Sequence, residues 1–258
     1  MLELFSDPYL LITLSLVGFI AGFIDAIAGG GGLLTVPVLL TSGLPPHIAL
    51  GTNKLAACFG SLTASLTFYR KKLFNPMFWI FAAFATAIGA TVGTIIVNLI
   101  SAEMLNKALP VVILCCALYA FFCKNVFNDS SALPEQSFAL KIKQSLQGFL
   151  LGFYDGAAGP GTGTFWVVSS LALYKMNILL SSGLSRSMNF ISNFVSFVIF
   201  AYFGQVNIMI GLAMGLFMLL GSWIGAHSAI RYGNKFIRPI FIIVVMLMAI
   251  KLAYLAWL

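Results

Sequence analysis

Long apolar segments separated by short polar stretches make up nearly the whole chain. In the first half they run at about residues 9–28, 33–44, 47–69, 76–100 and 105–123, and in the second half at about 144–158, 161–174, 178–203, 206–230 and 236–257. Most of them approach or exceed the roughly 20 apolar residues that a helix needs to span a bilayer. The pattern predicts an all-α, polytopic membrane protein with about five hydrophobic segments in each half.

The second segment of each half, at about 33–44 and 161–174, is only about a dozen residues long. With a rise of about 1.5 Å per residue, such a helix falls short of a hydrocarbon core about 30 Å thick. We therefore expect each to be a short or broken helix that follows a glycine-rich break. The pattern leaves open whether these two segments span the membrane or re-enter it.

The same kind of break, an aspartate followed by glycines, precedes both short segments. The first reads DAIAGGGGLLTVP from Asp25, and the second reads DGAAGPGTGT from Asp155. At a shift of 130 residues, the first-half positions Gly18, Gly22, Phe23, Asp25, Gly29 and Gly31 align with Gly148, Gly152, Phe153, Asp155, Gly159 and Gly161. At a shift of 132, Gly51, Lys54, Gly89 and Gly93 align with Gly183, Arg186, Gly221 and Gly225. The chain therefore divides into a first repeat (1–123), a polar cytoplasmic linker (124–141) and a second repeat (142–258).

Basic residues in the loops indicate that the two repeats have opposite orientations. After the third segment, positions 70–72 are all basic in the first repeat, whereas the equivalent loop 204–207 has no basic residue. After the fourth segment the bias is reversed, with Arg231, Lys235 and Arg238 in the second repeat. By the positive-inside rule, this pattern predicts inverted repeats. It also predicts a multi-pass protein of the bacterial inner membrane whose N- and C-termini are periplasmic.

The composition excludes a water-soluble domain. The chain is 60% hydrophobic and only 8% charged, whereas soluble domains have about 25% charged residues. A net charge of +7 is typical of nucleic-acid binding, but here the basic residues lie at segment ends, where the positive-inside rule accounts for them. The cysteines, Cys58, Cys115, Cys116 and Cys123, have no metal-type spacing, and no metal or cofactor is predicted.

Four ionisable residues remain inside the predicted spans: Asp25, Lys54, Asp155 and Arg186. A charge at the bilayer centre costs about 2.5–3.5 kcal/mol, so such residues usually face the bundle interior. Lys54 and Arg186 are predicted to supply positive charge to an anion, and Asp25 and Asp155 are candidates for proton coupling. Two alternatives stay open. Each acid pairs with a base to hold the broken helix, or Lys54 extends to the outer membrane face.

The glycine runs predict a binding site for an anion. Glycine permits unusual backbone conformations and the close approach of a ligand, and the first amides of a helix favour negative charge. The predicted substrate-binding residues are Gly30, Gly31, Gly32, Asn53 and Lys54 in the first repeat, and Gly161, Thr162, Gly163, Arg186 and Asn189 in the second. The alternative is that the glycines only allow the helices to pack closely.

These motifs resemble those of the sulfite exporter TauE/SafE family of membrane permeases. The resemblance is carried by GFIDAIAGGGGLLTVP at 22–37, ALGTNKL at 49–55 and GFYDGAAGPGTG at 152–163, and it extends over nearly the whole chain. It implies a duplicated helical permease of the bacterial inner membrane. It also implies that the substrate is sulfite, a sulfonate or another small sulfur-containing anion.

Together, the pattern and the resemblance predict a secondary transporter of a small anion that works by alternating access. Its predicted partners are the small anionic substrate and the lipid bilayer, without nucleic acid; a homo-oligomer is left open. An anion-selective channel that uses the same site is the alternative. An intramembrane enzyme is disfavoured, because the chain has no HExxH or GxSxG motif and no histidine near the breaks. The sequence does not determine the substrate, the transport direction or the coupling ion.

Overall fold

The computed structural model describes residues 8–105, 107–108, 111 and 132–233. This part of the chain contains helices and no strands, so the all-α prediction is confirmed. The helices are α1 (Pro8–Ala28), α2 (Gly32–Thr41), α3 (Pro46–Arg70), α4 (Ile80–Leu99), α6 (Phe138–Ala157), α7 (Thr162–Tyr174), α8 (Ile178–Tyr202) and α9 (Ile208–Tyr232). Nearly all of the predicted segment 105–123, all of 236–257, the first part of the linker (124–131) and both chain termini lie outside the described residues.

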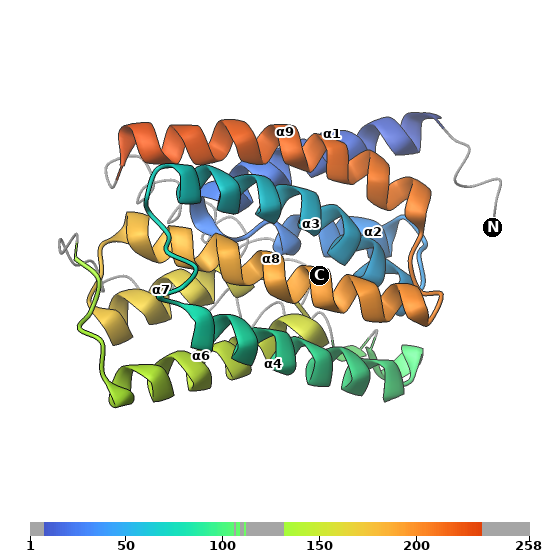
Figure 1. Ribbon diagram of the computed structural model, residues 1–258. Helices are drawn as coiled ribbons and strands as arrows, with labels where there is room; N and C mark the ends of the chain where they lie inside the picture. Colours follow the sequence, from blue (N-terminus) through green and yellow to red (C-terminus); the bar gives the residue numbers. More distant parts are fainter. Residues whose placement is uncertain (1–7, 106, 109–110, 112–131, 234–258) are drawn as a thin grey trace.

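The long helices of the described part form three layers (Figure 1). Helix α1 packs along α9 in one outer layer, and α4 packs along α6 in the other. Between them lie α3 and α8, which contact each other; α3 also contacts α9, and α8 also contacts α4. Since α1 is equivalent to α6 and α4 to α9, each outer layer combines the first helix of one repeat with the fourth helix of the other.

Glycines bring the two outer pairs of helices close together. A Cβ atom on Gly221 would lie 2.0 Å from the carbonyl oxygen of Phe19, and one on Gly89 would lie 2.2 Å from that of Phe149. These two contacts are equivalent, because the shifts of 132 and 130 residues relate their members. At these positions a glycine therefore allows close helix packing.

Equivalent helices run in opposite directions through the bundle. The loop from α3 to α4 lies at one end of the molecule, and the loop from α8 to α9 lies at the other (Figure 1). The first end carries the exposed basic residues at positions 70–72 together with Lys141, Lys143 and Arg231, and we call it the basic end. This arrangement is the one that an inverted repeat requires, while the orientation of the basic end in the membrane stays a prediction.

Three described helices are long and apolar enough to cross a membrane: Tyr9–Ala28, Ile80–Leu99 and Ile208–Tyr232. Helices α3 and α8, with 25 residues each, are about 37 Å long. They are less apolar because they carry the polar side chains of the middle layer. Helices α2 and α7 have 10 and 13 residues, which gives them lengths of about 15 and 20 Å. The prediction of two short helices is confirmed.

Helix α6 begins at Phe138, earlier than the start near residue 144 that the apolar pattern predicts. The Ser137 side chain accepts a hydrogen bond from the amide of Leu140 and so caps the helix. Lys141 and Lys143 then occupy the exposed face of the first turns. A hydrophobicity pattern misses such a start because the first turns are polar on the side that faces away from the bundle.

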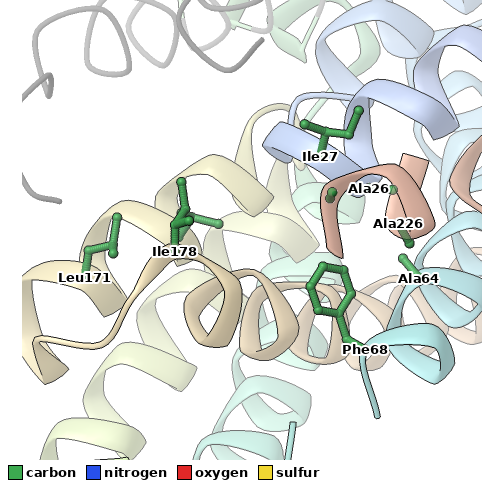
Figure 2. Packing of buried hydrophobic residues seen from close by; sticks show 9 residues of the cluster. Ala26, Ile27, Ala64, Phe68, Leu171, Ile178 and Ala226 are labelled. Atoms are coloured by element: carbon green, nitrogen blue, oxygen red, sulfur yellow. The ribbon is translucent and has the colours of Figure 1, made fainter. Parts of the chain in front are cut away.

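A buried hydrophobic cluster joins several helices at the basic end (Figure 2). Ile27 comes from α1, Phe68 from α3, Leu171 from α7, Ile178 from α8 and Ala226 from α9. Ile27 and Phe68 have no exposed surface. Because Ile27 immediately precedes the first glycine run, this packing fixes the position of the first break relative to α7 and α8.

Candidate functional site

The two glycine-rich breaks lie against each other inside the bundle. The carbonyl oxygen of Gly29 accepts a hydrogen bond from the amide of Thr164 at 3.2 Å. The Thr164 hydroxyl donates to the carbonyl oxygen of Ala28 at 3.0 Å. Gly29 has a φ of +86°, and a Cβ atom on it would lie 2.3 Å from the carbonyl carbon of Gly163. Only glycine fits at this position, so the first run serves both a left-handed backbone and a close contact with the second run.

Asp25, near the end of α1, binds Arg186 of α8. The Arg186 Nη1 atom lies 3.4 Å from Asp25 Oδ2 and also donates a hydrogen bond to the main-chain carbonyl oxygen of Asp25. The other carboxylate oxygen, Oδ1, accepts a hydrogen bond from the amide of Gly31 at 3.1 Å. Arg186 is completely buried. Asp25 therefore ties the break of the first repeat to a cation of the second repeat.

Asp155, near the end of α6, binds Lys54 of α3. The Lys54 Nζ atom lies 2.8 Å from Asp155 Oδ1 and also donates to the main-chain carbonyl oxygen of Asp155. The Thr162 hydroxyl donates to Oδ1 at 3.0 Å, and the Ser192 hydroxyl donates to Oδ2. Lys54 is 1% exposed and Asp155 is 2% exposed. The second break is thus held by a cation of the first repeat.

Each acid is paired with the base of the other repeat. Lys54 and Arg186 are equivalent positions, as are Asp25 and Asp155, so the two ion pairs are equivalent by the internal repeat. The prediction that Lys54 extends to the outer face is wrong, because its ammonium group is buried and bound to Asp155. Acid–base pairing is present, and each pair joins an acid of one repeat to a base of the other repeat.

A small cavity of about 20 Å³ lies between the breaks. Its walls are formed by Asp25, Gly29, Gly32, Asn53, Ala57, Asp155, Gly159, Gly161, Thr162, Gly163, Asn189, Asn193 and Met218. This volume accommodates about one water molecule.

Most of the predicted site residues lie on this wall. Those that do are Asp25, Gly32, Asn53, Asp155, Gly161, Thr162, Gly163 and Asn189, and those that do not are Gly30, Gly31, Lys54 and Arg186. The two cations are held behind the wall, because the carboxylates that they bind form part of it. The predicted set does not include five wall residues: Gly29, Ala57, Gly159, Asn193 and Met218. Asn193 follows Asn189 by one helical turn, which is a signal that it shares the same face; nothing in the sequence singles out Met218.

At the start of α2, amides predicted to bind an anion already donate hydrogen bonds within the protein. The amide of Gly31 donates to the Asp25 carboxylate, and those of Leu34 and Thr35 donate to the carbonyl oxygen of Gly31. A carboxylate at a helix N-terminus is favoured by the helix dipole. In this conformation Asp25 therefore supplies the negative charge that the sequence assigns to a bound anion at this position.

Arg186 retains unused hydrogen-bonding capacity. Its Nε and Nη2 atoms are buried and have no hydrogen-bond partner in the described part of the chain. The Oδ1 atom of Asn189, one turn further along α8, is in the same situation. A buried polar group without a partner costs about 1–3 kcal/mol, and more when it is charged. Two hydrogen-bond donors of Arg186 therefore stay unused beside its bonds to Asp25.

The described residues contain no group of three or more His, Cys, Asp or Glu side chains that could hold a metal ion. The chemistry of the site is that of ion pairs, hydroxyls and amides.

Comparison with known proteins gives a family and several relatives. The model of the sulfite exporter TauE/SafE family matches residues 14–252. A probable membrane transporter protein of Haemophilus influenzae is 38% identical over 251 residues, which cover 95% of this chain and 95% of that protein. The probable membrane transporter protein YfcA of Escherichia coli K12 is 34% identical over 248 residues, which cover 96% and 91%. No solved structure matches the chain.

Proposed function

The chain is a membrane transporter that belongs to the sulfite exporter TauE/SafE family, and on this premise we propose that it carries a small sulfur-containing anion by alternating access. Sulfite and sulfonates are the proposed substrate class. The observation that carries the proposal is the exchange of ion pairs between the repeats, Lys54 with Asp155 and Arg186 with Asp25. Each cation that would bind the substrate is held by a carboxylate, which is itself an anion.

The proposed binding step is a competition between the substrate and these carboxylates. An entering oxyanion competes with Asp155 for Lys54, and with Asp25 for Arg186 and the amide of Gly31. The unpartnered Nε and Nη2 donors of Arg186 form a planar fork that suits an oxyanion. Because both ion pairs join opposite repeats, displacement of either carboxylate loosens the contact between the repeats. Alternating access requires such a loosening.

Proton coupling follows from the same competition. A protonated Asp25 or Asp155 no longer neutralises the cation that it contacts. Protonation of the carboxylate therefore strengthens the binding of the substrate anion to that cation. By linkage, a bound anion favours the proton to the same extent. We therefore propose that the anion and the proton move in the same direction.

Flux of sulfite into proteoliposomes tests the proposal. We expect saturable uptake that an inward proton gradient accelerates. Arg186→Gln should lower uptake about ten-fold or more, because a buried, charge-assisted interaction is lost. Lys107→Gln is the matched control, since Lys107 forms an exposed pair with Glu103 and should not affect uptake.

Two results would contradict the proposed substrate class or the proposed role of Arg186. Wild-type flux no faster than that of empty liposomes for sulfite, thiosulfate and sulfonates would exclude the substrate class. Normal flux through a folded Arg186→Gln variant would exclude Arg186 from the binding site.

An anion-selective channel is the alternative use of the same site. It predicts flux that follows the anion gradient and cannot accumulate the anion against it. The cavity of about 20 Å³ favours a carrier over an open pore. Accumulation of the anion against its gradient, driven by protons, would exclude the channel.

A further inference from the structure

Four buried polar atoms on α6, α7 and α8 have no hydrogen-bond partner in the described part of the chain. They are Oγ of Ser181 and of Ser182 on α8, Nε1 of Trp166 on α7, and Oε1 of Gln144 on α6, and none has a hydrogen-bond partner among the described residues. Each of these side chains is at most 1% exposed. Since one such atom costs about 1–3 kcal/mol, packing alone does not account for the group.

These atoms lie between the central site and the basic end. Helix α8 starts at the basic end, and Ser181 and Ser182 precede Arg186 by about one turn. Helix α6 also starts there, and Gln144 directly follows the exposed Lys143. Both helices therefore lead from charged, exposed residues, past buried polar atoms, to the ion pairs.

A hydrogen-bonded group joins α6 to α7 in the same region. Gln147 Nε2 donates to Ser169 Oγ at 2.7 Å and to Ser170 Oγ at 3.1 Å, and the Tyr174 hydroxyl donates to Gln147 Oε1 at 2.7 Å. Helix α7 packs on α8, and α6 contacts both. We call seven polar side chains of these three helices the polar seam, of which Ser169 is half-buried and the others are buried: Gln144, Gln147, Ser169, Ser170, Tyr174, Ser181 and Ser182.

The first repeat has apolar residues at the equivalent positions. At the shift of 130 residues, Gln144, Gln147, Ser169 and Ser170 correspond to Leu14, Val17, Leu39 and Leu40; at the shift of 132, Ser181 and Ser182 correspond to Ala49 and Leu50. Leu14, Leu39 and Ala49 are fully buried and belong to one hydrophobic cluster. The same fold therefore packs these positions with hydrocarbon in one repeat, so the polar seam is not a requirement of packing.

Unpartnered side-chain oxygens at the opposite end differ in kind. They belong to Asn98, near the end of α4, and Gln205, in the loop from α8 to α9. Both side chains are half-buried at the edge of the bundle. The fully buried, unpartnered group is confined to the side of the basic end within the described residues.

We infer that the polar seam is the route by which water and the transported anion pass between the central site and the basic end. The apolar interface of the first repeat is the seal on the opposite side. Hydroxyl and amide groups hydrogen-bond a passing oxyanion without holding it by charge, whereas a packed hydrocarbon interface excludes water until the repeats separate. The inference rests on the transport function proposed above but does not depend on which anion is carried.

Cysteine labelling tests the route. Single cysteines at Ser170 and Ser182, with matched controls at Leu40 and Leu50, are introduced into a background without the native cysteines, and Lys71→Cys marks the basic end. A membrane-impermeant maleimide is then added to right-side-out or inverted vesicles. We expect Ser170→Cys and Ser182→Cys to react from the face that labels Lys71→Cys. From that face they should react about ten-fold faster than Leu40→Cys and Leu50→Cys, because Leu50 is 1% exposed and the half-buried Leu40 packs against a hydrophobic cluster of the first repeat.

Equal reaction of the seam and control cysteines from that face would overturn the inference. So would unreactive seam cysteines in protein that transports. Labelling reports water access and needs no substrate, so a failed route is distinguished from a failed substrate class, which would appear as an absence of wild-type sulfite flux.

A second variant covers the case in which the cysteine-free background does not fold. Ser181→Ala/Ser182→Ala removes the two unpartnered hydroxyls. As parts of the route, they should leave the melting temperature unchanged or raised while transport slows several-fold, because an unpartnered buried hydroxyl destabilises the fold. A lower melting temperature with unchanged transport would show a structural role and refute the inference.

Discussion

Two buried ion pairs, Lys54 with Asp155 and Arg186 with Asp25, are the central feature at the scale of single residues. Taking two charges out of water costs several kcal/mol per ion, and mutual attraction offsets this only partly, so a buried ion pair is weak evidence for stability. Here each cation also bonds a main-chain carbonyl oxygen next to a glycine-rich break. The pairs therefore hold the breaks in place while keeping a cation beside the cavity.

Removal of one partner should destabilise the protein more than removal of both. Lys54→Met or Asp155→Asn leaves an uncompensated buried group and should lower the free energy of unfolding by about 3–5 kcal/mol, whereas the double variant should recover much of this loss. Transport should be abolished in Lys54→Met and in the double variant, because both lack the cation. Thermal melting of purified protein and flux in proteoliposomes are the measurements. A double variant as unstable as the worse single variant would contradict the prediction.

Replacement of both carboxylates should remove the pH dependence of transport. Under the proposed co-transport of anion and proton, wild-type uptake should increase as the pH falls. In Asp25→Asn/Asp155→Asn the cations are free at every pH, so uptake should no longer respond to protons. Initial rates between pH 5 and pH 8 are the measurement, and Glu103→Gln, at an exposed position, is the control. A pH profile in the double variant that matches the wild type would exclude proton coupling through these residues.

At the scale of elements, helix packing depends on glycines that recur in both repeats. A Cβ atom on Gly22 would lie 2.3 Å from the carbonyl oxygen of Met218, and one on Gly152 would lie 2.4 Å from that of Thr86. Both distances are far below van der Waals contact with backbone atoms, which cannot rotate away. The outer layers, α1 with α9 and α4 with α6, therefore tolerate no side chain at these positions.

Gly22→Leu and Gly152→Leu should destabilise the protein to a similar extent. Overpacking of a close helix crossing costs about 1–3 kcal/mol or more, because the two helices must separate. Ile88→Leu on α4 is the control, since Ile88 is 57% exposed on the surface that would face lipid. Melting temperatures of the three variants in one detergent are the measurement. A melting temperature of either glycine variant equal to that of the control would contradict the packing role.

At the scale of the whole molecule, charge is distributed unevenly along the bundle axis. The described exposed basic residues lie at the end that holds the loop from α3 to α4, except Lys107, which pairs with Glu103 after α4 at the other end. The positive-inside rule assigns the basic end to the cytoplasm. The polar seam leads to that end, so the proposed hydrated route would open toward the cytoplasm.

The assignment of the two ends is tested in intact cells. In a cysteine-free background, Glu103→Cys should react with an impermeant thiol reagent from outside, whereas Lys71→Cys should react only after the membrane is permeabilised. The opposite pattern would show that the basic end faces outward, against the positive-inside rule.

The sequence by itself determined the helical class, the approximate spans, the two short helices and the equivalence of the two repeats. It did so because bilayer thickness sets the length of apolar segments, and because a glycine run after an aspartate is readable without knowledge of contacts. It also identified most of the residues that line the cavity. It missed Asn193, and it started α6 late, because polar residues within or before an apolar segment weaken the hydrophobic pattern.

Only the tertiary structure decided which acid binds which base. Because Lys54 and Arg186 occupy equivalent positions in the two repeats, the sequence is equally compatible with two pairings. Asp25 could bind Lys54 of its own repeat or Arg186 of the other repeat. Coulomb attraction depends on distance in space, and the crossing of the two breaks brings Arg186, not Lys54, to Asp25. Burial likewise depends on which helices pack together, so only the fold reveals that polar atoms at the basic end lack partners while their apolar equivalents are packed.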